Sequence, residues 1–338
     1  MEGYKSSTAI GMRMNFSDRL GLQEADLTVS YTPETRLPAD ERWHVRGHYA
    51  YSGFGLSFAY NGADFYDLVG PTKTSRKGYS VGLDYDKTLI FDDPRSMNLT
   101  LALTRYGDLE RLPDFQNVAT SFDEFLTFAT DLIYSNRAAS LGAVSHEKGH
   151  RWQLSSHATY VRGNLYPQVI GRLDLGTPLP LHHSSVWLRT AAGLATADRD
   201  EPFANFYFGG FGNNWVDHRS IARYGQWYSF PGLALNQIAG TNFAKATLEW
   251  KLPPLHFRRV GFSALYLTWA RFALFSSALI TNLDAASVQH VAASAGAQMD
   301  VRIRLLSQFK LTLSLGFARA AEKRRRATDE FMISLKVL

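Results

Sequence analysis

Residues 205–220, NFYFGGFGNNWVDHRS, decide how the rest of the chain is interpreted, and they continue as IARYGQWYSFPG over residues 221–232. This stretch is rich in glycine and aromatic residues and has the period of neither a helix nor a strand, so it predicts one long loop. Long structured loops between strands are usually functional or disordered, and the aromatic content argues against disorder. We expect the loop, residues 198–239, to fold back into the lumen of a β-barrel whose wall is the rest of the chain.

Outside this loop, apolar and polar residues alternate with a period of two over most of the chain. Residues 242–252, for example, put Lys245 and Glu249 on one face and Leu248 and Trp250 on the other. The segments number about sixteen, with fourteen as the alternative if two segments in the middle of the chain merge. Aromatic residues at the segment ends favour a lipid-facing apolar side. We therefore expect an all-β fold, a transmembrane antiparallel β-barrel with a long extracellular loop folded into its lumen.

The composition fits such a barrel. Phe, Tyr and Trp make up 13% of the 338 residues, which is high for a soluble domain and suits two interfacial girdles of aromatic residues. A charged content of 20% and a mean hydropathy of −0.19 fit a wall in which lumenal polar residues alternate with lipid-facing ones. The absence of cysteine excludes disulfides and thiolate metal sites. Residues 1–338 are expected to form a single barrel domain.

The charge and the N-terminus set further expectations. A net charge of +5 is too small to indicate nucleic-acid binding, so no nucleic-acid partner is expected. Residues 1–16 lack the apolar region of a secretory signal. We expect this chain to be a mature form or an excised domain, without its signal peptide and without an N-terminal periplasmic domain. The longest apolar run, residues 260–280, carries Arg271 at its centre, which argues against a membrane-spanning helix.

One motif suggests an enzyme. His146-Glu147-Lys148-Gly149-His150 matches the H-E-x-x-H zinc signature, which requires a helix with both histidines on one face. The surrounding sequence indicates strand, turn and strand, where the two histidines have no reason to converge. A metallopeptidase is therefore only a remote alternative, and we expect no catalytic residue, no metal site, no cofactor and no enzymatic activity.

The C-terminal part of the chain resembles the bacterial surface antigen family, the C-terminal barrel of the outer-membrane assembly and two-partner-secretion translocon superfamily. The stretches that carry the resemblance are FYFGGFGNNW, NFAKATLEWKLPPL, ALYLTWARFALF and the terminal EFMISLKVL, and it covers roughly residues 140–338. The family implies sixteen strands, a lumenal loop with an arginine at its tip, and a seam between the first and last strands. That seam would join residues 9–16 to residues 330–338.

The resemblance implies site residues on the loop and on the inner wall. The closest match to the tip is Ile221-Ala222-Arg223-Tyr224-Gly225, where the order is altered; Arg223 is one candidate arginine and Arg219 a second. A buried arginine needs a carboxylate, so an Arg223–Glu249 contact is expected, the alternative being that each is solvated in a wet lumen. The expected loop residues are Phe208, Gly209, Gly210, Phe211, Gly212, Trp215, Arg219, Arg223 and Tyr224, and the expected wall partners are Lys245, Glu249, Trp269 and Arg271.

Two functions remain open besides the peptidase. The resemblance implies protein insertion into, or translocation across, the bacterial outer membrane, with client polypeptides and accessory proteins as partners. The absence of a periplasmic module favours instead a passive pore or a membrane anchor for that missing domain. Outer-membrane lipid is an expected partner of either, and lipopolysaccharide phosphates are a further expected partner of the basic run at residues 323–326.

Overall fold

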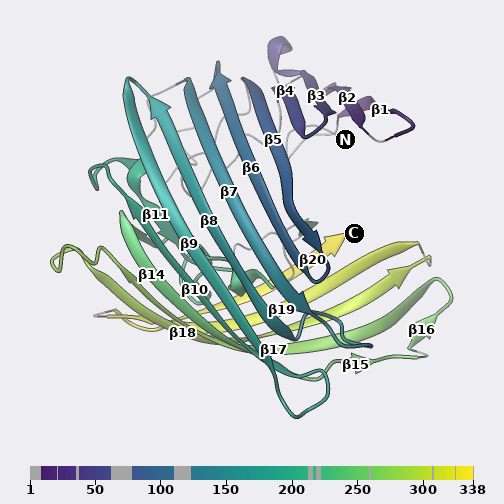
Figure 1. The fold of residues 1–338 in the computed structure, drawn as a ribbon, viewed down its shortest axis with the longest axis vertical. Helices are drawn as coiled ribbons and strands as arrows, with labels where there is room; N and C mark the ends of the chain where they lie inside the picture. Colours follow the sequence, from purple (N-terminus) through teal and green to yellow (C-terminus); the bar gives the residue numbers. More distant parts are fainter. Residues whose placement is uncertain are drawn as a thin grey trace.

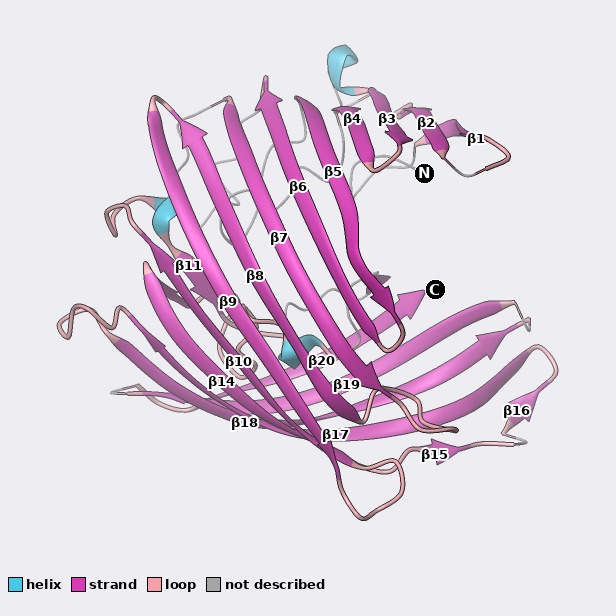
Figure 2. Ribbon diagram, in the orientation of Figure 1, coloured by secondary structure: helices cyan, strands magenta, loops and turns pink. Residues whose placement is uncertain are grey.

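The structure, a computed structural model, describes residues 9–20, 22–35, 38–61, 78–109, 123–211, 216–217, 222–258, 260–306, 308–323 and 325–337. Within these residues the chain is almost entirely β-structure, and one large sheet contains every long strand (Figures 1 and 2). The long strands are β1 (Ile10–Ser17), β2 (Gln23–Tyr31), β3 (Trp43–Tyr51), β4 (Phe54–Tyr60), β5 (Tyr79–Asp92), β6 (Arg95–Gly107), β7 (Phe125–Ala138), β8 (Lys148–Val161), β9 (Asn164–Pro178), β10 (Ser185–Ala195), β14 (Asn242–Lys251), β17 (Leu265–Thr281), β18 (His290–Leu305), β19 (Phe309–Glu322) and β20 (Thr328–Val337).

Each long strand pairs in antiparallel fashion with the next long strand of the chain, so the sheet is an up-and-down meander. The remaining elements are short: β11 (Phe206–Phe208), β12 (Val216–Asp217), β13 (Ile238–Gly240), β15 (Leu255–His256), β16 (Gly261–Phe262) and the single-turn helices η1 (Ala39–Glu41), η3 (Pro202–Ala204) and η4 (Arg223–Gly225). No helix of the described residues is both long enough and apolar enough to cross a membrane.

The strand count differs from the expected sixteen because one predicted segment, residues 137–146, is not a strand of its own. The described residues hold fifteen long strands. The segment predicted at residues 122–133 corresponds to β7, which runs on to Ala138, and the further strand predicted at residues 137–146 has only its first two residues in β7. Residues 139–147 form the connection to β8, with a turn at residues 141–142 in which Gly142 takes the left-handed φ of +89°. The strand predicted at residues 258–273 begins later and runs longer, as β17, because its alternation continues to Thr281.

The sheet has apolar residues outside and polar residues inside. On β14 and β17, Leu248 and Trp250 are 53% and 39% exposed and Leu274 is 42% exposed, whereas Glu249 and Arg271 on the same strands are 0% and 8% exposed. The prediction that Lys245 and Glu249 share the face opposite Leu248 and Trp250 is confirmed. A soluble sandwich would have the opposite arrangement.

The first and last strands are the edges of the sheet. Among the described residues, β1 pairs only with β2, and β20 pairs with β19 and, in parallel, with the two residues of β12. The expected seam of β1 with β20 is therefore not among these pairings, because the C-terminal end of β20 pairs instead with Val216–Asp217. The sheet curls so that β1 and β20 lie on the same side of the molecule (Figure 1).

Candidate functional site

The connection between β10 and β14, residues 196–241, is called the inner loop here. It was predicted to lack regular structure, but β11 and β13 pair with each other, and a bridge joins Gly210 to Phe230. These pairings return the loop on itself because its two ends must meet the neighbouring strands β10 and β14. We call the parts of the inner loop before and after the single-turn helix η4 its two legs; they contain β11 and β13, respectively. In space, η4 lies in the hollow of the curved sheet (Figure 2).

Glycines let the loop turn close to the sheet. Gly210 and Gly232 take φ values of +60° and +98°, in the region that L side chains avoid. At Gly232 a Cβ would also lie 2.5 Å from the backbone nitrogen of Ala320 on β19. The loop backbone therefore approaches the wall more closely there than any other residue would allow.

Aromatic side chains fill the space between loop and wall. Phe206 and Phe208 pack edge-on against Phe243 of β14, with ring centroids 4.9 Å and 4.8 Å apart, and Trp227 stacks on the same ring. A second cluster joins Phe211 and Tyr224 of the loop to wall residues such as Phe275 and Met332. The inner loop and these apolar wall residues thus form a hydrophobic core on the concave side, next to the buried charged residues of the wall.

Tyr224 makes the most buried polar contact between loop and wall. Its hydroxyl donates a 2.6 Å hydrogen bond to Oε1 of Glu249, and its ring stacks on Phe275 at 4.4 Å and 6°. Glu249 Oε2 accepts from Nε and Nη2 of Arg189 at 2.9 Å and 2.6 Å. The third arm of Arg189, Nη1, lies 3.1 Å from Asp174 Oδ2. One arginine therefore joins two buried carboxylates, and the loop tyrosine completes the set.

The side chain of Lys245 binds the backbone of the inner loop. Its Nζ donates to the carbonyl oxygens of Gln226 at 2.8 Å and Trp227 at 3.2 Å, and to that of Ser229. A buried ammonium needs this kind of compensation, because it loses its hydration shell. All three donors of Lys245 are used to fix one turn of the loop.

Glu330 holds the loop from the last strand. Its carboxylate accepts hydrogen bonds from the backbone N–H of Phe211 at 2.9 Å and of Gly232 at 2.9 Å. The neighbouring Thr328 hydroxyl donates to the Gly232 carbonyl. Both legs of the inner loop are thereby bonded to β20, the strand at the edge of the sheet.

The expected Arg223–Glu249 contact is wrong. Glu249 is bonded to Tyr224 and Arg189, and the guanidinium of Arg223 lies 3.5 Å from the carbonyl oxygen of Phe211 within the loop itself. The physical reason is that Arg189 already supplies two N–H groups to Glu249 from the adjacent strand, where sheet register fixes it. Tyr224, the neighbour of Arg223 in η4, is the residue bonded to Glu249.

The other predicted residues fall into three groups. Phe208 and Phe211 are buried, and Gly209 and Gly210 between them both have positive φ. Gly212, Trp215 and Arg219 lie outside the described residues. Among the wall residues, Lys245 and Glu249 contact the loop as described. Arg271 pairs with Asp300 on β18 at 2.7 Å, and Trp269 lies against Arg271 and Arg302, so these residues organise the wall below the loop.

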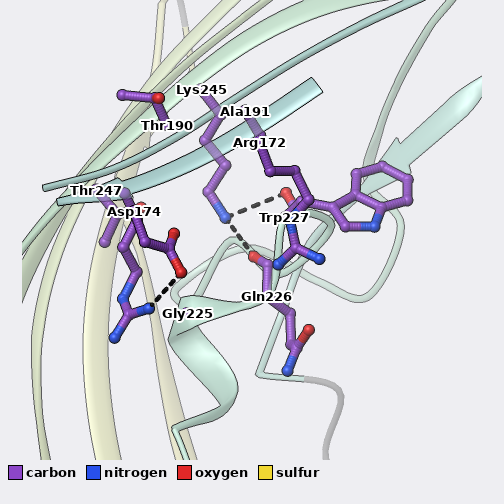
Figure 3. A pocket seen from close by; sticks show the side chains of 10 residues that line it. Arg172, Asp174, Thr190, Ala191, Gly225, Gln226, Trp227, Lys245 and Thr247 are labelled. Carbon is purple, nitrogen blue, oxygen red and sulfur yellow. Dashed lines mark hydrogen bonds and ion pairs between the residues drawn. The ribbon is translucent and has the colours of Figure 1, made fainter. Parts of the chain in front are cut away.

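A small pocket lies between wall and loop (Figure 3). It is lined by Arg172, Asp174, Arg189, Thr190, Ala191, Gly225, Gln226, Trp227, Lys245 and Thr247, and it has about 230 Å³ of space free of protein atoms, including the part that opens to solvent. Figure 3 shows the Lys245 ammonium and the Arg172 guanidinium beside the loop backbone at Gln226 and Trp227.

The H-E-x-x-H motif does not lie on a helix. The motif was predicted to lie on a turn between two strands, but the boundaries differ: residues 146–147 end the connection and Lys148 to His150 already belong to β8. Glu147 accepts from the Ser140 backbone and hydroxyl, and its Oε1 lies 2.9 Å from His183 Nδ1. In the described part of the chain, no group of three or more His, Asp or Glu side chains could hold a metal ion. This carboxylate instead joins the 139–147 turn to the β9–β10 turn.

Sequence reasoning missed Arg189, Asp174 and Glu330. Each has the signal that identified Glu249, a charged residue on the polar face of an alternating strand. What the sequence lacks is the register, which places Arg189 opposite Asp174 on one side and beside Glu249 on the other.

Comparison with known proteins assigns no family. No protein-family model matches the chain, and no curated protein matches it. Among solved structures, one similar chain is Wzi of Escherichia coli, described as an outer-membrane protein involved in group 1 capsule assembly and a carbohydrate-binding β-barrel. The identity is 10% and the TM-score 0.32, over 96% of this chain and 77% of Wzi.

Proposed function

We propose that this chain is a β-barrel of the bacterial outer membrane that acts in the insertion or translocation of polypeptides, with the inner loop occupying its lumen. The observation that supports the membrane location is the inverted polarity of the sheet. Leucine, phenylalanine and tryptophan side chains are exposed on its convex side, while arginines and carboxylates are buried on its concave side. Charged groups inside and apolar groups outside suit a wall between lipid and a polar lumen.

The role with polypeptides is supported by the edge of β20. Beyond the two residues paired with β12, the described part of β20 has no partner strand on that side. An edge strand presents unpaired N–H and C=O groups that can template another strand. Because Glu330 also bonds both legs of the inner loop, an incoming strand at this edge would meet the loop and the wall at the same place.

Photo-crosslinking tests this role directly. A photoreactive phenylalanine analogue at Phe331, 60% exposed on the edge strand, is expected to form adducts with unfolded outer-membrane polypeptides. The matched control is Phe317, which is 51% exposed, on the same face, and opposite Phe331 on the fully paired strand β19. Equal adducts at both positions, or none at either, would reject the insertion role.

A sealed anchor for another domain is the second candidate, and the filled hollow of the sheet favours it. In the residues that the structure describes, the inner loop packs its aromatic residues against β14 and β17, and a small pocket lies beside them. Conductance measured in a planar bilayer distinguishes a sealed anchor from a passive pore. The intact chain is expected to conduct little and a variant lacking residues 209–235 to conduct strongly. A large conductance of the intact chain would show that the lumen is not closed by the loop.

A further inference from the structure

The inner wall beside the pocket carries more positive charge than its carboxylates compensate. Six cationic side chains share one face of β7, β8, β9, β10 and β14, namely Arg137, Arg151, Arg172, Arg189, Lys245 and Lys251. Three carboxylates face them: Asp131, Asp174 and Glu249. Among the described residues, Arg189 alone of the six forms an ion pair, so the other five charges are not neutralised by contact.

Register places a gap between two of these cations. Gln153, Arg172, Ala191 and Lys245 form one cross-strand row over β8, β9, β10 and β14. Ala191 separates Arg172 from Lys245 and has only a methyl group, so it forms the floor of the pocket. The backbone of Gly225, Gln226 and Trp227 forms its other side. The pocket is therefore a small cavity with a cation on either side.

The guanidinium of Arg172 lines the pocket and has N–H donors that could bind a ligand. Its Nη1 donates to Gln153 Oε1 at 3.1 Å, an oxygen that Arg151 also uses at 3.1 Å. A guanidinium carries five N–H donors in a planar fork. In the part of the chain that the structure describes, no other acceptor for Arg172 is within hydrogen-bond distance. Arg172 lines the pocket, and most of its N–H donors have no acceptor among the described residues.

We propose that this pocket binds a small oxyanion, a phosphate or a carboxylate, on Arg172. Guanidinium forks match the oxygen geometry of both groups and bind them through charge-assisted hydrogen bonds. Lys245 and Arg189 add positive charge but use their own donors on the loop and on Glu249. A concave cationic surface with low-dielectric walls strengthens the attraction for an anion. The inference requires the pocket only, and does not depend on polypeptide insertion.

Calorimetric titration of the detergent-solubilised chain at low ionic strength tests the proposal, with inorganic phosphate in one arm and acetate in the other. Saturable binding of at least one of them is expected at millimolar concentration, weakening as salt is added. Phosphate binding alone would identify a phosphate site and acetate binding alone a carboxylate site. No binding of either would overturn the proposal.

Three variants locate the binding. Arg172→Gln is expected to weaken it about tenfold or more, by removing the charge-assisted contact. Ala191→Leu leaves every charge in place and fills the pocket floor, so it is expected to abolish binding. Arg95→Gln removes an exposed arginine paired with Asp92 at the β5–β6 turn and is expected to change nothing. Circular dichroism checks that each variant is folded.

Two results from these variants would reject the site. Unchanged binding in Arg172→Gln or in a folded Ala191→Leu would place the anion elsewhere. An equal loss in Arg95→Gln would show a general effect of net charge. Because all readouts are anion binding in detergent, failure here leaves the insertion role untouched, and failure of the crosslinking experiment leaves the anion site untouched.

Discussion

The Tyr224 hydroxyl lies 2.6 Å from Oε1 of Glu249, a carboxylate that is 0% exposed and also bonded to Arg189. This single contact joins the inner loop to the most buried charged group of the wall. Tyr224→Phe removes it while keeping the ring stacked on Phe275, and hydrogen bonds to charged groups contribute about 1.5–3 kcal/mol. We expect a loss of that size in the free energy of unfolding, and faster proteolysis of the loop. Tyr160→Phe, at an exposed tyrosine of β8, should leave both unchanged.

Arg189 should be harder to replace than any surface arginine. Arg189→Met leaves Glu249 and Asp174 buried without their cation, and breaking a buried ion pair costs about 3–5 kcal/mol. Arg105→Met breaks an exposed pair with Glu124, for which about 0–1 kcal/mol is expected. Denaturant unfolding of the two variants measures the difference. Equal costs would show that the buried network contributes nothing specific.

The closeness of the loop to β19 can be tested at Gly232. Gly232→Ala requires both an unfavourable φ and a Cβ that meets the Ala320 backbone at 2.5 Å. Gly163→Ala, in the β8–β9 turn at φ +81°, has the same kind of backbone but nothing within 4 Å of the Cβ. The left-handed conformation alone costs about 1–2 kcal/mol. We expect Gly232→Ala to lower the midpoint of thermal unfolding more than Gly163→Ala does. We also expect protease to cleave the inner loop faster in Gly232→Ala.

The outer face should be intolerant of charge if it contacts lipid. Leu248→Lys, on the convex side of β14, is expected to cost about 2–4 kcal/mol of unfolding free energy in lipid vesicles, the range for a lysine near the middle of a bilayer. Leu141→Lys, fully exposed in the turn before β8, should cost almost nothing. If Leu248→Lys left the unfolding free energy in vesicles unchanged, the result would contradict the membrane location.

The 139–147 turn should loosen at low pH. Burial acts to raise the pKa of Glu147, but hydrogen bonds from Ser140 and from His183 outweigh it and hold the pKa below its usual value, about 4.3. Because the folded pKa is the lower one, the stabilisation is present above the unfolded pKa and is lost as pH falls through the folded pKa. The protection of residues 139–147 against amide exchange, measured relative to the unfolded chain at the same pH, should therefore fall below about pH 4. Glu147→Gln should remove that pH dependence. If the variant kept the same dependence of amide exchange on pH, Glu147 would not be its cause.

Much of the wall could be read from alternation, because side chains of a strand point to opposite faces with a period of exactly two residues. This predicted the inward Lys245 and Glu249 and a non-helical backbone at the H-E-x-x-H motif. It failed where a turn is short of distinctive residues, as at Arg137, which belongs to β7 and not to a further strand. It also failed inside the inner loop, whose short strands are set by pairing with each other and not by their own pattern.

By itself, the sequence determined the all-β class, the polar and apolar faces, and the position of a glycine-rich aromatic loop, since each follows from residues close together in the chain. Only the tertiary structure decided the partners. Arg189 and Glu249 are 60 residues apart and Phe211 and Glu330 are 119 apart. Which of several inward charges meet is set by strand register and by the path of the loop, and these depend on contacts that no local pattern records.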